Sequence, residues 1–347
     1  MAHQLDRKYL LQTMENLIRI PSPVGYYEEI TPLLHEMAGS LGYKLEFDRK
    51  RTAYIKVKGE SSHKTVCVGA HLDTLGLVVR SINSDGTMLV RNIGGINYNN
   101  IEGETATVHT RDGRSYTGMI VCKYHSVHVF DEAKTINRNE NTMLFVLDQD
   151  ISSKEQVRTL GIQNGDVISL ETHFNITETG FIKSRYIDNK ACAACVFSVL
   201  KYMKENNLKP ACDTWFAFPF YEEIGHGGAY VPEEISEYIA LDIGVIGPEH
   251  AGSEETVSIC SKDAFSPYDR ELTTKVIDIA KEAEVDYVVD VFYHYSTDGG
   301  GAIKAGNNVQ AAAFGPGTFS SHGMERTTIH AVEETQRLLL EVLLNNK

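Results

Sequence analysis

The 347-residue sequence contains no apolar run long enough to span a membrane, and its first residues lack the apolar core of a signal peptide. Basic residues are comparatively scarce: 33 lysines and arginines oppose 47 aspartates and glutamates, which gives a net charge of −14. This excess of negative charge argues against a surface that binds nucleic acid or anionic membranes. We therefore expect a soluble, cytoplasmic protein that binds neither nucleic acid nor membranes.

Cysteine is also scarce, because six residues in a chain of this length are too few for a disulfide framework. Cys192 and Cys195 have the C-x-x-C spacing of redox and metal motifs, but they lie in an apolar helical pattern without a second pair. We interpret them as small side chains that pack a helix. The sequence also lacks internal repeats, a phosphate-binding loop and a dinucleotide-binding fingerprint.

Strands and helices alternate at both ends of the chain, which predicts an α/β fold with a mixed sheet covered by helices. Apolar residues at helical spacing near the start of the chain stop at Pro21, where a rigid turn is expected. Apolar runs predict buried strands at 65–70, 215–220 and 238–244. This is a chain with a large buried core.

The pattern changes between residues 75 and 171, where short alternating strands and frequent turns are typical of a small all-β module. We predict an α/β domain built from residues 1–72 and 169–347. Residues 73–168 would form an inserted β domain that serves oligomerisation and supplies one wall of a cleft.

The aromatic-rich run that begins at Trp215 ends in two adjacent carboxylates, Glu222 and Glu223, followed by glycines. We interpret this stretch as a buried strand that carries charge at its end. On an extended backbone, consecutive acids project in different directions, so one can bind a metal while its neighbour faces a substrate or water. An isolated acid pair is more often a solvated strand end. The metal-binding interpretation therefore requires further ligands.

Other imidazoles and carboxylates occur at comparable places. His71 ends a predicted strand, and Asp73 shares its face of the extended segment and could orient the imidazole. Asp188 precedes a long apolar helix, where a carboxylate is a natural cap. Asp242 ends another buried strand, and His322 lies in a polar loop before the final helix. Taken singly, each residue has an ordinary structural explanation.

Together these residues form a set at strand ends and loops, where open α/β sheets place their ligands. The set consists of His71, Asp188, Glu223, Asp242 and His322. Five such groups suffice for two metal ions when one carboxylate bridges ions about 3.5–4 Å apart. Glu222, which is adjacent to a ligand, is then the candidate general base.

The motifs around these residues resemble, in their order along the chain, those of the M42 family of metallo-aminopeptidases, which includes glutamyl, deblocking and tetrahedral aminopeptidases. They are His71-Leu72-Asp73, Asp188-Asn189-Lys190, Tyr221-Glu222-Glu223-Ile224-Gly225, Leu241-Asp242-Ile243-Gly244 and Ser321-His322. The resemblance implies that His71 and Asp242 hold one metal ion. It implies Glu223 and His322 for the other ion, with Asp188 bridging both. It also implies that Glu222 is the base and that Asp73 steers His71.

The same resemblance implies an enzyme that hydrolyses the N-terminal residue from peptide substrates with two divalent metal ions per subunit, Zn²⁺ or Co²⁺. It implies a zinc-peptidase-like α/β catalytic domain and a PDZ-like insertion, which in the family builds dimers that assemble into hollow dodecamers. The stretch from Glu223 to Gly228 departs mildly from the commoner family pattern after the acid pair. This departure concerns the pocket more than the metal ligands.

Other functions stay open on the sequence. The same site could hydrolyse a different amide, as a carboxypeptidase or a deacylase, and some relatives have been labelled endoglucanases. The chain could also be a non-catalytic, metal-stabilised assembly that binds peptides, although such a protein would have little need for Glu222. Lys262 or Arg185 could favour acidic substrates, and the loops 263–266 and 296–301 are candidate walls of the pocket.

Overall fold

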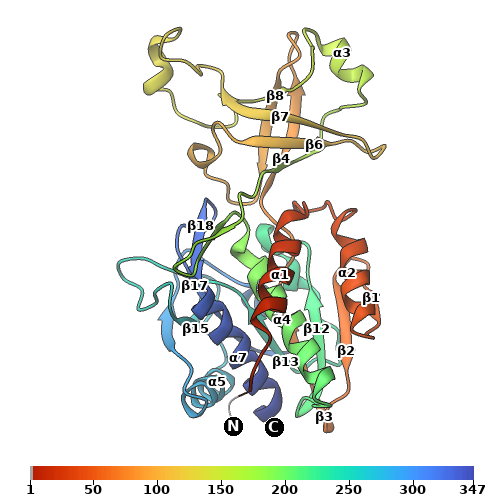
Figure 1. The fold of residues 1–347 in the computed structure, drawn as a ribbon, viewed down its shortest axis with the longest axis vertical. Coiled ribbons are helices and arrows are strands. Elements are labelled where there is room, and N and C mark those ends of the chain that lie inside the picture. Colours follow the sequence, from red (N-terminus) through yellow and green to blue (C-terminus); the bar gives the residue numbers. More distant parts are fainter. Residues whose placement is uncertain (1–2) are drawn as a thin grey trace.

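The computed structural model describes residues 3–347 of the chain, which form a large α/β part and a smaller β-barrel (Figure 1). In the view of Figure 1 the barrel lies above the α/β part, and the C-terminal end of the chain lies at the bottom. The helices are α1 (Arg7–Arg19), α2 (Ile30–Ser40), α3 (Lys154–Thr159), α4 (Ile187–Glu205), α5 (Arg270–Glu282), α6 (Asp298–Lys304) and α7 (Ile329–Asn345). None of the helices in this described range combines the length and apolar character needed to cross a membrane.

A mixed sheet of nine strands organises the α/β part, as the sequence predicts. Its strands are β1 (Leu45–Phe47), β2 (Ala53–Val57), β3 (Ser61–Gly69), β12 (Cys212–Phe218), β13 (Glu237–Leu241), β14 (Gly244–Val245), β15 (Val257–Lys262), β16 (Tyr287–Val291) and β17 (Gln310–Thr318). Eight of them lie in the order β1-β2-β12-β3-β13-β17-β15-β16, and β14 pairs with β17. Because β12, β3, β13 and β17 run parallel, their carboxyl ends meet at one edge of the sheet.

Helices cover both faces of this sheet. Residues of α1, α2, α4, α5 and α7 share one apolar core with the sheet, whereas α6 packs against the opposite face. The central helix α4 is apolar on nearly all sides, which suits a helix buried between a sheet and other helices. Its Phe197 stacks on Phe218 of β12, with ring centroids 5.1 Å apart. Cys192 and Cys195 are buried in α4 as free thiols, in agreement with their interpretation as packing residues.

Six antiparallel strands close into the barrel. They are β4 (Gly76–Ile82), β5 (Met88–Ile93), β6 (Thr105–His109), β7 (Ser115–Cys122), β8 (Met143–Leu147) and β9 (Val167–Leu170), in the order β4-β5-β8-β7-β6-β9. The barrel has an apolar core of its own, which includes Phe145. The all-β module predicted from alternation is therefore a closed barrel. Its likeness to a PDZ domain and the domain boundaries at residues 73 and 168 stay predictions.

A small antiparallel sheet of three strands joins two distant parts of the chain: two of its strands lie between β9 and α4, and the third lies between β17 and α7 (Figure 1). Its strands are β10 (Asn175–Ile176), β11 (Phe181–Ser184) and β18 (Glu325–Thr328). Four short 3₁₀ segments complete the assigned structure: η1 (Tyr98–Asn100), η2 (Asp131–Lys134), η3 (Glu222–Ile224) and η4 (Gly227–Ala229).

The prediction that Glu222 and Glu223 lie on an extended backbone at the end of the central strand is wrong. β12 ends at Phe218, and Glu222 and Glu223 lie on the 3₁₀ turn η3. The turn ends at Gly225, whose φ of 81° is accessible to glycine at little cost. The turn, rather than the alternation of a strand, sets the different directions of the two carboxylates.

Candidate active site

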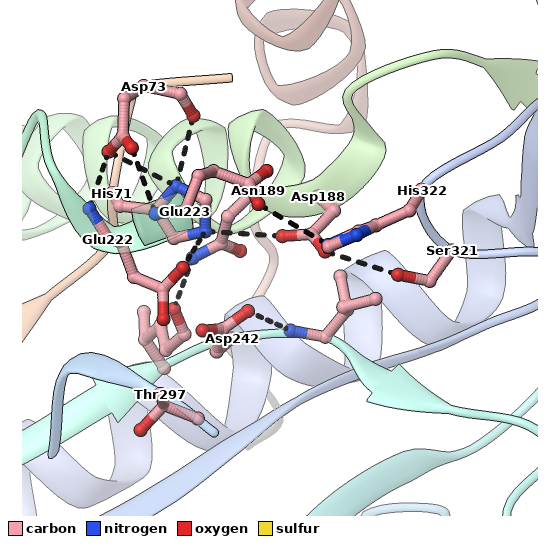
Figure 2. A network of polar contacts seen from close by, with 12 residues as sticks. His71, Asp73, Asp188, Asn189, Glu222, Glu223, Asp242, Thr297, Ser321 and His322 are labelled. Atoms are coloured by element: carbon pink, nitrogen blue, oxygen red, sulfur yellow. Dashed lines mark hydrogen bonds and ion pairs between the residues drawn. The ribbon is translucent and has the colours of Figure 1, made fainter. Parts of the chain in front are cut away.

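The carboxyl ends of the parallel strands bring the predicted site residues together (Figure 2). His71 follows β3, Glu222–Glu223 follows β12, and Asp242 follows β13. His322 lies in the loop between β17 and β18. Asp188 lies at the start of α4, where its ψ of 103° departs from the regular helical conformation. Side chains far apart in the sequence thus converge at the edge where open α/β sheets bind ligands.

Asp188 lies at the centre of this cluster. Its Oδ1 is 3.2 Å from His71 Nε2, and its Oδ2 is 3.8 Å from His322 Nε2. His322 Nε2 also lies 3.3 Å from Glu223 Oε2. On the other side, His71 Nε2 is 3.7 Å from Glu222 Oε2. The two oxygens of Asp188 therefore face the two halves of the cluster, which is the arrangement that a bridging carboxylate requires.

Both imidazoles are held through Nδ1, whereas Nε2 faces Asp188. His71 Nδ1 lies 3.1 Å from the backbone oxygen of Asp73, and His322 Nδ1 lies 3.2 Å from that of Gly95. A backbone oxygen can only accept, so each Nδ1 is the donor, and in the neutral imidazole Nε2 has the lone pair that a metal ion would use. Gly95 follows strand β5, so the barrel contacts the site directly. A Cβ at this position would lie 2.9 Å from His322 Nδ1, and glycine permits the close approach.

Asp73 fixes the backbone of the acid pair. Its carboxylate accepts hydrogen bonds from the backbone N–H groups of Glu222 and Glu223, at 3.1 and 3.0 Å. One carboxylate oxygen is also 3.6 Å from His71 Nδ1. The contact with the acid pair is absent from the sequence interpretation, which assigned Asp73 only to the orientation of His71.

Glu325, a residue that sequence reasoning missed, holds two parts of the cluster in place. Its buried carboxylate accepts hydrogen bonds from the backbone N–H groups of Asp188, at 2.9 Å, and His322, at 3.1 Å. It connects the start of α4 to the loop before β18. A glutamate three residues after His322 was visible in the sequence, but no local pattern distinguishes it from a surface residue.

Negative charge in the cluster exceeds what its own cations neutralise. Burial raises the pKa of Glu222 and of Asp242 well above the usual range, and neighbouring carboxylates add to the rise. Burial likewise raises the pKa of Asp73 to about 7. Burial alone would lower the pKa of His71, but the hydrogen bond to Asp188 and the surrounding carboxylates raise it well above its ordinary value. A divalent cation would relieve this repulsion.

The donor atoms fit a divalent metal ion. Ligand atoms of His71, Glu222 and Asp242 lie within 4.8 Å of one another, as do those of His71, Asp188 and Glu223. Imidazole nitrogens and carboxylate oxygens are common ligands of Zn²⁺ and of several other divalent ions. The first group includes Glu222, which was predicted as a base, because its carboxylate faces His71 in this structure.

A cavity of about 530 Å³ opens onto the cluster, and we call it the site cavity. Its polar side consists of Asp188, Glu222, Glu223, Asp242 and His322. The remaining wall is made by Gly225, Val245, Ile246, His294, Tyr295, Ser296, Thr318, Ser320 and Ser321. Of the two loops predicted as walls, the one at 296–301 contributes Ser296. The wall opposite the carboxylates is largely uncharged.

The two cations considered for substrate selection do not line this cavity. Arg185 donates to the backbone oxygen of Asn100 at 2.6 Å and to Glu104 at 2.9 Å, so it joins the α/β part to the barrel. Lys262 donates to the backbone oxygen of Asp263 at 2.7 Å. Neither residue therefore provides the site cavity with a positive charge that would select an acidic substrate.

Comparison with known proteins relates the chain to peptidases. Residues 52–338 match the family model described as M42 glutamyl aminopeptidase. The chain is 34% identical over 330 residues to YhfE of Bacillus subtilis (strain 168), with 95% of each protein covered.

Two solved structures have a similar fold at low sequence identity. One is the TET aminopeptidase of the marine sediment archaeon Thaumarchaeota archaeon SCGC AB-539-E09, with a TM-score of 0.87, 19% identity and 97% of each chain covered. The other is the TET1 peptidase of Pyrococcus horikoshii, with a TM-score of 0.85, 19% identity, and 97% of this chain and 99% of that chain covered. The second peptidase can assemble into a tetrahedron or a large octahedral shell.

Proposed function

The chain belongs to the M42 glutamyl aminopeptidase family and is a peptide hydrolase, and on this premise we propose that it removes the N-terminal residue from peptides with the help of two divalent metal ions. The observation that carries the proposal is the convergence of four carboxylates and His322 on one cavity, with His71 directly behind them in contact with Asp188. A sheet edge of this kind is where α/β enzymes bind their substrates.

In the proposed centre, His71 and Asp242 would hold one ion, and Glu223 and His322 the other. Asp188 would contact both, as the positions of its two oxygens favour. Zn²⁺ and Co²⁺ suit this set of nitrogen and oxygen donors. When bound, such ions polarise a carbonyl group and lower the pKa of water.

Glu222 is the proposed general base. It lines the site cavity, and its carboxylate is placed through the hydrogen bond from its backbone N–H to Asp73. In the proposed reaction Glu222 removes a proton from the attacking water and then gives it to the nitrogen of the leaving amine. Glu223, one residue further along the same 3₁₀ turn, faces His322 and is left to bind metal.

We also propose that the chain self-associates into dimers and into a dodecamer, with the barrel as a contact surface. The similar TET1 peptidase of Pyrococcus horikoshii can form a tetrahedron or an octahedral shell. The barrel region carries large apolar side chains that are exposed in the single chain, among them Met119, Val127 and Val129. Exposed apolar groups of this kind are enriched where proteins associate.

The proposed activity is tested with matched peptides that differ only at their ends. We expect the metal-loaded protein to hydrolyse peptides with a free N-terminus, including those with an amidated C-terminus, because removal of the N-terminal residue requires a free α-amino group at the site. N-acetylated versions should react at least about 10²-fold more slowly, because their nitrogen is blocked and the acetyl group adds bulk beside it. A chelator should abolish the activity, and Zn²⁺ or Co²⁺ should restore it. Equal hydrolysis of acetylated peptides, or preference for a free C-terminus, would contradict the proposal.

A further inference from the structure

Tyr295 lines the site cavity and has a buried hydroxyl group without a hydrogen-bond partner among the described residues. The residue lines the cavity together with Asp188, Glu222 and Asp242. Its Oη is buried, and no atom of the described residues 3–347 forms a hydrogen bond with it. The hydroxyl lies beside Asp242 without hydrogen-bond geometry to it; burial raises the pKa of that carboxyl, and the nearby hydroxyl offsets part of the rise. Buried hydroxyl groups normally form a hydrogen bond, so a bound ligand is a candidate partner for this hydroxyl.

The position of Tyr295 is fixed by its surroundings. Its ring packs edge to face on Phe292, with centroids 5.2 Å apart. Its backbone oxygen accepts a hydrogen bond from the N–H of Ala264 at 2.8 Å. Two residues later, Thr297 is hydrogen-bonded to Tyr268 at 2.6 Å. The ring and the backbone of Tyr295 are therefore held in place beside the carboxylates of the site.

The chemistry of a bound peptide decides which of its atoms this hydroxyl would meet. The N-terminal ammonium has only donors, so it needs an acceptor rather than the proton of a phenol. The oxygen of the scissile carbonyl has only lone pairs and requires a donor. A neutral phenol is such a donor. Asp242 does not accept a hydrogen bond from this phenol, and one of its oxygens already accepts one from the backbone N–H of Ile243 at 2.8 Å.

We propose that Tyr295 is a further catalytic residue, whose Oη–H donates a hydrogen bond to the scissile carbonyl oxygen as that oxygen gains negative charge; this rests on the proposed aminopeptidase function. In the first step the water oxygen forms a bond to the carbonyl carbon, and the π electron pair moves to the carbonyl oxygen. The water proton goes to Glu222. In the second step the electron pair returns, the C–N bond breaks, and the proton on Glu222 moves to the leaving nitrogen. Tyr295 keeps its own proton throughout.

The test is Tyr295→Phe, which removes only the hydroxyl. We expect kcat for free-amine peptides to fall by about 10²-fold, the scale of one donor to a developing oxyanion, while KM changes by less than about threefold. Metal content should equal that of the wild-type protein. Inhibition by an aminophosphonate dipeptide, whose tetrahedral phosphorus oxygens mimic the charged carbonyl oxygen, should weaken by a factor similar to the loss in kcat.

Tyr293→Phe is the matched control, because Tyr293 lies in the same loop but is exposed and does not line the cavity. It should behave as the wild-type protein does. A kcat of Tyr295→Phe within about threefold of wild type, or a loss of its metal, would overturn the inference. If the wild-type protein hydrolyses none of the free-amine peptides, the proposed function fails and this inference fails with it. An active wild-type protein with an unimpaired Tyr295→Phe variant contradicts this inference alone.

Discussion

Replacing Glu222 with glutamine is expected to lower kcat by about 10²–10⁴-fold, the range that a positioned general base contributes. Glutamine keeps the shape of the side chain and the backbone hydrogen bond to Asp73, but it cannot take a proton from water. The proposed metal ligands are unchanged, so the metal content of Glu222→Gln should stay close to that of the wild-type protein. Stopped assays at saturating substrate, together with elemental analysis of the same samples, measure both quantities.

Glu233→Gln provides the control for this variant, since Glu233 is an exposed glutamate in the loop that follows the acid pair. It should leave kcat and metal content unchanged. Normal turnover in Glu222→Gln would remove Glu222 as the base. Loss of metal from Glu222→Gln would instead assign Glu222 to metal binding, as its proximity to His71 and Asp242 also permits.

Replacing Asp188 with asparagine is expected to lower both metal content and activity, the latter by at least about 10³-fold. The amide keeps the size of the carboxylate but loses its charge, and it offers only one oxygen where the proposed bridge needs two. The backbone N–H of residue 188 still bonds to Glu325, so the start of α4 should keep its place. Metal equivalents per chain after dialysis, and the rate with a free-amine peptide, provide the measurement.

The neutral substitution Asp278→Asn tests whether any loss of one carboxylate has this effect. Asp278 is exposed on α5, distant in the fold from the site cavity, and its replacement should change neither quantity. Full metal content and full activity in Asp188→Asn would rule out a bridging role for Asp188.

The position of the site at one edge of the sheet could be predicted from the sequence, because the carboxyl ends of parallel strands lie at the same edge. His71, the acid pair and Asp242 each follow a run of apolar residues, and the runs pair as β3, β12 and β13 of one sheet. Asp188, before a predicted helix, and His322, in a polar loop, belong to the predicted set by residue type and position, and the resemblance to the family implies their roles. Their convergence in the structure agrees with that expectation, whereas their individual roles stay proposals.

The contacts that hold these side chains could not be predicted, because they depend on how distant segments pack. Nothing in the local sequence shows that Asp73 bonds to the backbone of Glu222, 149 positions along the chain. Glu325 reaches Asp188 across a similar distance in sequence. Tyr295 enters the site cavity from a loop whose path is set by Phe292 and Thr297. Aromatic residues in loops are common, and only the folded structure distinguishes this one.

The 3₁₀ turn at the acid pair is another feature that could not be predicted from the sequence pattern. The apolar run before it indicates a buried strand, but the strand stops at Phe218. The positive φ of Gly225 and the hydrogen bonds from Glu222 and Glu223 to Asp73 then define the turn. Apolar periodicity contains no information about these backbone bonds.

The central claim is that five side chains form one binuclear metal centre, and anomalous X-ray diffraction from crystals of the Zn²⁺-loaded wild-type protein tests it most directly. We expect two anomalous peaks about 3.5–4 Å apart in the site cavity. One peak should contact His71 and Asp242, the other should contact Glu223 and His322, and Asp188 should contact both. A single peak, or peaks ligated by other residues, would contradict the account.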